Sequence, residues 1–94
     1  MHAESLQIDF HLPGCRSLKE KRRRLARLRD KFGRVTNMAV CESGQNDVHD
    51  RAQWTFLAIA SSEKIVHKTI QEVCEWSAHT LDATIVRVHR EHIA

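Results

Sequence analysis

The segment from Ser17 to Gly33 constrains the fold of this chain more than any other segment does. Its apolar residues recur every three to four positions, which is the period of one face of an α-helix. Ser17 with Glu20 three residues later matches a capping box, and Gly33 is available for the positive φ that often ends a helix. We therefore predict a helix between Ser17 and Gly33. Its inner stripe consists of Leu18, Lys21, Leu25, Leu28 and Phe32.

The predicted helix is strongly basic, although the chain as a whole is not. Between Arg16 and Arg34 there are ten Lys or Arg residues and two acidic residues, a local charge of +8. The other 75 residues hold five basic and ten acidic residues, which accounts for the overall net charge of +3. A mildly acidic body that carries one cationic element indicates where an anionic partner would bind.

Four segments have the pattern of β-strands. In the first, apolar and polar residues alternate, which is typical of a half-buried strand, and a Pro-Gly pair ends it. The third is apolar on both faces, which indicates a central position in a sheet or a covered second face. The four segments are residues 6–12, 35–42, 53–60 and 83–89.

A second amphipathic helix is predicted between the third and fourth strands. Ser61 or Ser62 can cap it, and its apolar stripe extends to His79. The tail from His89 to Ala94 is predicted to fray, as chain ends usually do.

The predicted order is therefore strand, helix, strand, strand, helix, strand. Short connections and right-handed crossovers fold this order most economically into a ferredoxin-like βαββαβ sandwich of the α+β class. We expect a single domain over residues 1–94, with a four-stranded antiparallel sheet and two helices on one of its faces.

The entry into the basic helix carries a resemblance to a known family. The run HLPGCRSLKEKRR at residues 11–23 resembles the signature of the YlxP-like family of small uncharacterised bacterial proteins. Residues 38–42 and the pair Arg51-Ala52 are similar to that family's second strand and to the start of its third. The resemblance implies a ferredoxin-like fold. It also implies an RNA- or ribosome-linked role, because the family's genes often lie among those for translation initiation and ribosome maturation.

The basic helix is the candidate binding surface. Side chains that neutralise phosphates give a salt-dependent affinity, and the guanidinium fork of Arg suits a phosphate. We expect contact with ribosomal RNA or the ribosome. The alternatives are a solvated helix face that complements the acidic body and a membrane-surface helix, which is disfavoured because the core needs the apolar stripe. The predicted nucleic-acid or anion-binding residues are Arg16, Ser17, Lys19, Lys21, Arg22, Arg23, Arg24, Arg27 and Lys31.

Lys21 is unusual because it lies within the apolar stripe. One interpretation is that its stem covers the edge of the core while the ammonium reaches water. The other is that it presents a cation beside the helix N-terminus, where free N–H groups already favour an anion. Together with Arg16, Ser17 and Lys19 it could then hold a phosphate, which makes a small-anion-binding enzyme or sensor a third hypothesis.

The third strand places two aromatic residues, Trp54 and Phe56, on one face, opposite Leu57 and Ile59. An apolar sheet face without a covering layer often forms a homodimer, so Trp54 and Phe56 are the predicted dimer interface. Burial in the core and stacking of RNA bases are the alternatives. A homodimeric module that docks an acidic protein through its basic helix is accordingly the second functional hypothesis.

Signals for catalysis are weak. The chain has no nucleophile elbow, no paired carboxylates at a useful spacing and no Gly-rich nucleotide loop. Asp9 and His11 share a strand face, but strand residues two apart are usually only neighbours. The seven histidines are scattered, and no metal or cofactor is expected. An enzyme is therefore the minor hypothesis.

The chain has three widely spaced cysteines, Cys15, Cys41 and Cys74, and this pattern does not indicate a disulfide framework. Cys15 precedes the basic helix, where a nearby positive charge can lower a thiol pKa. The N-terminus has no apolar run typical of a signal peptide, and no apolar stretch reaches the roughly 20 residues needed to span a bilayer. We expect a cytoplasmic protein.

Overall fold

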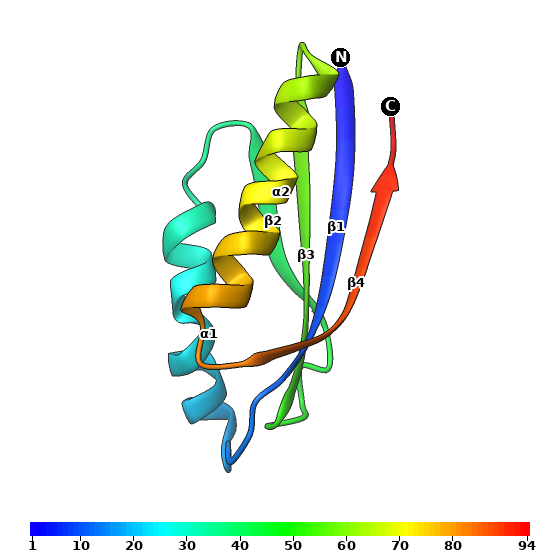
Figure 1. Cartoon of the computed structure of the whole chain (residues 1–94). Helices are drawn as coiled ribbons and strands as arrows, with labels where there is room; N and C mark the ends of the chain where they lie inside the picture. The colour runs from blue at the N-terminus through cyan, green and yellow to red at the C-terminus, as the bar shows by residue number, and fades with distance from the viewer.

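A computed structural model describes all 94 residues, from Met1 to Ala94. Both helices lie on the same face of one sheet, and the two termini lie at the same end of the molecule (Figure 1). The ferredoxin-like α+β prediction is therefore confirmed. The elements are β1 (His2–His11), α1 (Leu18–Phe32), β2 (Met38–Gly44), β3 (Arg51–Ala60), α2 (Glu63–Thr80) and β4 (Thr84–His92).

The sheet has the strand order β2-β3-β1-β4, and every neighbouring pair is antiparallel. The two central strands pair over their whole length, from His2 opposite Ala60 to His11 opposite Arg51. The pairing of β1 with β4 shifts register after Asp9, and that of β2 with β3 shifts at Gly44. The irregular ladders thus belong to the two edge strands, as β-bulges commonly do.

The ends of two strands differ from prediction for local reasons. β2 begins at Met38 because Val35 is held in a turn: its N–H donates to the carbonyl of Phe32, and its carbonyl accepts from Met38. The C-terminal tail does not fray. The N–H of Ala3 donates to the carbonyl of Ala94 at 2.8 Å, so β1 and the tail pair beyond the predicted strands.

The caps of α1 combine one confirmed prediction with one wrong one. The Ser17 side chain accepts from the N–H of Glu20 at 3.0 Å, as the capping pattern predicts. Gly33, however, has a φ of −68° and does not adopt the left-handed conformation. Glycine suits this position for another reason, because a Cβ atom there would lie 2.5 Å from the carbonyl oxygen of Arg29. At the start of α2 the capping residue is Ser62, which accepts from the N–H of Ile65.

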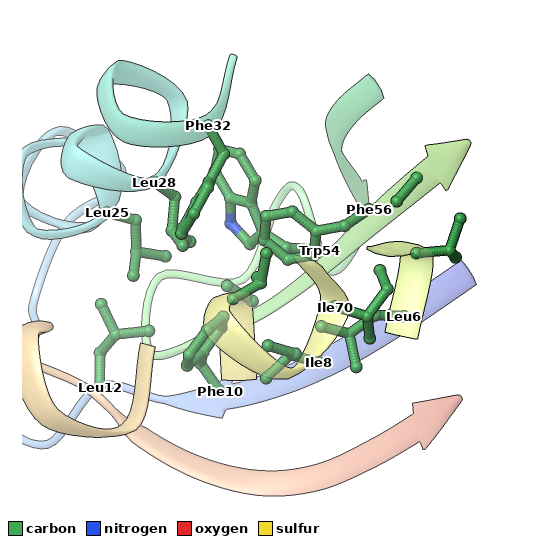
Figure 2. Packing of buried hydrophobic residues seen from close by; sticks show 14 of the residues in the cluster. Leu6, Ile8, Phe10, Leu12, Leu25, Leu28, Phe32, Trp54, Phe56 and Ile70 are labelled. Atoms are coloured by element: carbon green, nitrogen blue, oxygen red, sulfur yellow. The ribbon is translucent and has the colours of Figure 1, made fainter. Parts of the chain in front are cut away.

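The core lies between the helices and the inner face of β1 and β3. Trp54 and Phe56 both point into it, toward Phe32 of α1, as Figure 2 shows. The Phe32 ring packs edge-on against Phe56, with ring centroids 5.9 Å apart. The prediction of Trp54 and Phe56 as a dimer interface is therefore wrong. Successive strand residues face opposite sides, and the helices cover the aromatic side, which leaves Leu57 and Ile59 on the open face.

Candidate nucleic-acid interface

The α1 helix presents three sides to different surroundings. Its inner side packs Leu25, Leu28 and Phe32 into the core. One flank faces α2, and the other faces the edge strand β2. The basic residues have different partners on each of the three sides.

On the inner side, Lys21 is only 2% exposed although it carries an ammonium group. Its Nζ donates to the carbonyls of Gln45 at 2.9 Å and Arg51 at 3.1 Å, and lies 3.1 Å from Oε2 of Glu42. The two carbonyls accept hydrogen bonds from the ammonium, and the Glu42 carboxylate balances its charge. Gln45 has a φ of 59°, which is the left-handed conformation. The loop after β2 therefore takes this conformation at a residue whose carbonyl accepts from Lys21. Lys21 thus connects α1 to β2 through Glu42 and to β3 through Arg51.

This arrangement corrects both interpretations of Lys21. The ammonium does not reach water, and it is not available to an external anion, because acceptors of the protein already surround it. Ser17, a second member of the predicted anion site, uses its side-chain oxygen to cap the helix. The predicted small-anion site at the first turn therefore loses two of its four groups, leaving Arg16 and Lys19 exposed beside it.

The flank that faces α2 has its charges engaged within the protein. Arg24 is 15% exposed, donates to the carbonyl of Pro13 at 2.8 Å, and forms ion pairs with Glu20 at 3.0 Å and Asp82 at 3.5 Å. The guanidinium carbon of Arg27 lies 5.7 Å from the ring centroid of Trp76 on α2, within cation–π range. The predicted phosphate ligand Arg24 is thus a structural residue.

Burial and hydrogen bonding shift two pKa values at the start of this flank. Burial raises the pKa of the Cys15 thiol, whose Sγ lies 3.4 Å from the carbonyl of Ser17. The expectation of a depressed thiol pKa is therefore wrong, since desolvation outweighs the nearby charges. The Cys15 thiol, followed by the Arg24 guanidinium, lowers the pKa of Glu20. A neutral thiol beside an ionised carboxylate offers no nucleophile for catalysis.

The flank that faces β2 borders a groove of about 270 Å³. Arg22, Ala26 and Arg29 form its α1 wall, because positions four and three apart share one face of a helix. Neither arginine forms an ion pair within the chain. The small side chain of Ala26 between them keeps the wall open. The groove residues are Lys21, Arg22, Leu25, Ala26, Arg29, Asp30, Glu42 and Trp54.

Two side chains from neighbouring strands form the inner end of this groove. Glu42 of β2 and Trp54 of β3 lie directly opposite each other in the ladder. The indole Nε1 of Trp54 is buried and has no hydrogen-bond partner in the protein. The guanidinium carbon of Arg29 lies 5.7 Å from the centroid of the same indole ring. The groove thus has two arginines without acidic partners, Arg22 and Arg29, at its rim and the unpaired indole N–H of Trp54 at its inner end.

The predicted binding residues therefore separate into two groups. Ser17, Lys21 and Arg24 are engaged in the structure of the monomer, and Arg23 has only a long contact of 3.9 Å with Glu20. The members that are exposed and form no ion pair are Arg16, Lys19, Arg22, Arg27 and Lys31.

The prediction missed Arg29 and the partners of the groove on the sheet, Glu42 and Trp54. The four- and three-residue spacing of Arg22, Ala26 and Arg29 does predict a shared flank, but it does not mark Arg29 as a binding residue. No sequence pattern places that flank next to Glu42, because the contact depends on how α1 packs over the edge of the sheet.

Comparison with protein families places the chain in a recognised group. The profile described as "Protein of unknown function (DUF503)" matches residues 4–90, which include both helices and all four strands except the first two residues of β1 and the last two of β4. The chain belongs to the DUF503 family. No curated protein matches this DUF503 chain significantly in sequence.

Solved structures resemble the DUF503 chain in fold. Protein YJCS, solved by structural genomics, is 6% identical with a TM-score of 0.62, and the match covers 98% of this chain and 99% of that one. At3g17210 from Arabidopsis thaliana is 11% identical with a TM-score of 0.47, over 98% and 93% of the two chains. At such low identity, the similarity to YJCS shows the shared fold alone.

Two further features bear on what the DUF503 chain can bind. Neither α1 nor α2 combines the length and the apolar character that crossing a bilayer requires. No three His, Cys, Asp or Glu side chains come together in an arrangement that could hold a metal ion.

Proposed function

We propose that this DUF503 protein binds RNA at or near the ribosome and contacts the RNA phosphates through α1. The observation that carries the proposal is the set of cations on α1 that have no acidic partner. If the basic helix served only to complement the acidic body, most of its charges would be paired. Only Lys21 and Arg24 are paired with acids of the body.

The unpaired cations repel one another at close range. Lys19, Arg22, Arg27, Arg29 and Lys31 lie within four turns of one helix, and like charges at such spacing destabilise it. An anionic polymer offsets this repulsion and releases counterions as it binds. A phosphate backbone is the polymer that suits a row of guanidinium groups.

Two further observations support this proposal. The resemblance of residues 11–23 to the YlxP-like signature implies a link to translation. All three cysteines are free, as expected for work in the cytoplasm, where thiols stay reduced. The match to a family of unknown function is compatible with this role and adds no activity of its own.

The test is a salt titration of RNA binding. Fluorescence anisotropy with a labelled ribosomal RNA fragment, together with co-sedimentation with ribosomal subunits, should give an affinity that falls steeply as salt rises. Arg23→Glu combined with Arg27→Glu should weaken binding by about tenfold at low salt. Both side chains are exposed and neither belongs to the buried ion pair of Lys21, although Arg27 also lies over the ring of Trp76.

The matched control is Lys64→Glu with Lys68→Glu, which makes the same change of charge on α2. It should leave RNA affinity nearly unchanged. Equal losses in the two double variants would mean that only net charge matters. No loss in the α1 variant would contradict the proposal, and a protein partner that remains bound after nuclease treatment would favour docking of an acidic protein instead.

Self-association is a second candidate function, through the open face of the sheet rather than through Trp54 and Phe56. Leu57 and Ile59 are 39% and 43% exposed on that face, next to Ala39 of the edge strand. No layer of this chain covers them, and a second copy would bury them in an isologous contact.

Sedimentation equilibrium tests this second candidate. The unmodified protein should form dimers, and Leu57→Glu with Ile59→Glu should produce monomers. Ile65→Glu is the control, because Ile65 is equally hydrophobic and 50% exposed but lies on α2. A monomeric unmodified protein would rule the dimer out.

A further inference from the structure

We propose that the groove between α1 and β2 receives one unstacked base of a single-stranded RNA, with Arg22 and Arg29 holding the phosphates on either side of it. This inference rests on the proposed function and names the form of RNA that the site selects. It distinguishes the groove flank of α1, which reads an exposed base, from the outer arc, which contacts only phosphates.

The dimensions of the groove favour a single base. Its volume of about 270 Å³ lies just below the roughly 300–1,000 Å³ typical of pockets for drug-sized ligands. One ring system with part of its sugar suits such a space, whereas stacked neighbours do not. The opening depends on Ala26, since Arg22 and Arg29 on either side of it have long side chains.

The inner end of the groove offers the polar groups that a base edge needs. Trp54 has an indole N–H without a partner, and Glu42 lies directly across the ladder from it. Lys21 contacts one carboxylate oxygen of Glu42, Oε2, at 3.1 Å, which leaves the other oxygen to accept from a ligand. A donor beside an acceptor is complementary to the edge of a nucleobase, which carries both kinds of group.

Arg29 contacts the aromatic residue of the groove. Its guanidinium lies over the indole of Trp54, and the indole Nε1 is buried. No acidic residue forms an ion pair with Arg29, so the contact with the indole is the one that must break for the side chain to reach a phosphate. Its departure uncovers the indole, on which a base can stack or to which it can present an acceptor.

The charges around the groove select where the phosphates lie. The pair of Lys21 and Glu42 is neutral overall, and Asp30 at the exposed rim repels phosphate. Arg22 and Arg29 are the remaining charged groups of the lining. They stand two helical turns apart, and a strand that binds both brings its intervening base to Ala26. The bases of a duplex remain stacked and cannot enter.

The deciding variant is Ala26→Leu, which fills the groove without changing any charge. Anisotropy should show an affinity for a short single-stranded RNA that is about tenfold weaker than that of the unmodified protein. Affinity for a duplex of the same length should not change, because the phosphate contacts remain. Ala78→Leu, at an exposed position on α2, is the matched control and should leave both affinities unchanged.

A spectroscopic readout tests the same contact independently. Trp54 and Trp76 are the only tryptophans, so Trp76→Phe leaves Trp54 as the single indole reporter. Single-stranded RNA should alter its fluorescence, whereas the duplex should leave it unchanged. The Ala26→Leu comparison uses the unmodified background, so it stays informative even if Trp76→Phe folds poorly.

The outcomes separate the groove from the function on which it rests. If single-stranded RNA binds with the same affinity to Ala26→Leu and leaves Trp54 fluorescence unchanged, the groove proposal is overturned and RNA binding by α1 stands. If neither single-stranded nor duplex RNA binds the unmodified protein, the proposed function fails and the groove proposal fails with it.

Discussion

Both flanks of α1 carry arginine side chains, but acidic residues pair with the arginine on one flank and not with those on the other. On the flank toward α2, Arg24 is mostly buried and is held by a backbone carbonyl and two carboxylates. On the flank toward β2, Arg22 and Arg29 have no acidic partner and border a groove. The difference teaches that the charge of a helix does not define its binding surface. The neighbouring element decides which arginines are structural and which remain available.

The reason lies in what each flank meets. The loop before α1 and the end of α2 bring the Pro13 carbonyl and Asp82 to Arg24, and these compensate for its removal from water. An edge strand covers the other flank only in part. The small side chain of Ala26 leaves space between the helix and the strand, and Arg22 and Arg29 beside it stay exposed.

The largest effect is expected for the residue between the two flanks. Lys21→Met removes the partner of Glu42 and leaves the carbonyls of Gln45 and Arg51 without their shared donor. Losing one member of a buried pair costs several kcal/mol, and the partial exposure of Glu42 moderates the loss to about 2–4 kcal/mol. Urea unfolding followed by circular dichroism measures it.

The control for Lys21→Met is Arg23→Met, because the Arg23 side chain is 77% exposed. That variant should change the free energy of unfolding by less than about 0.5 kcal/mol. Adding Glu42→Gln to Lys21→Met should recover part of the loss, since an uncharged amide is less costly to leave unpaired. Equal stability of Lys21→Met and the unmodified protein would mean that Lys21 is not a structural residue.

A smaller effect distinguishes the two flanks directly. Arg24→Ala should lower the free energy of unfolding by about 1–2 kcal/mol, because it removes charge-assisted contacts from a site that is largely shielded from water. Arg22→Ala should lower it by less than about 0.5 kcal/mol, since Arg22 makes no such contact. RNA affinity should fall more in Arg22→Ala than in Arg24→Ala. If both variants cost the same stability, the two flanks do not differ as described.

The smallest effect concerns the pH dependence of the flank toward α2. The lowered pKa of Glu20 means that its carboxylate stabilises the folded state above its ordinary pKa, about 4.3, and that this stability is lost as pH falls through the folded-state pKa. Glu20→Gln should therefore be less stable than the unmodified protein at pH 7. The gap in urea midpoint should close below pH 4. A gap that widens in acid would contradict the assignment.

Most of the fold was predictable from the sequence because its signals are local. The capping of α1 by Ser17 needs only Glu20 three residues away, and the alternation along β1 needs only the pleat of a strand. The end of α1 shows the limit of such rules. Gly33 follows the last residue of the helix as predicted, but glycine suits this position because an added Cβ would lie too close to the carbonyl of Arg29, and not because φ is positive.

The candidate site was predictable only in outline. Charge counting identified α1 and most of its exposed basic residues, including Arg22 and Arg27. It did not separate them from Arg24, whose partner Asp82 lies more than fifty positions along the chain. The same limit explains the error at Trp54 and Phe56, because a strand that is apolar on both faces does not reveal which face the helices cover.

The sequence by itself determined the order of the elements, the identity of the basic helix and the positions where that helix begins and ends, since each depends on residues within a few positions of one another. Only the tertiary structure decided that Lys21 is buried between two strands, that the aromatic residues of β3 face inward, and that a groove opens beside Arg22 and Arg29. These three outcomes depend on contacts between residues far apart in the chain, and such contacts follow from packing rather than from local pattern.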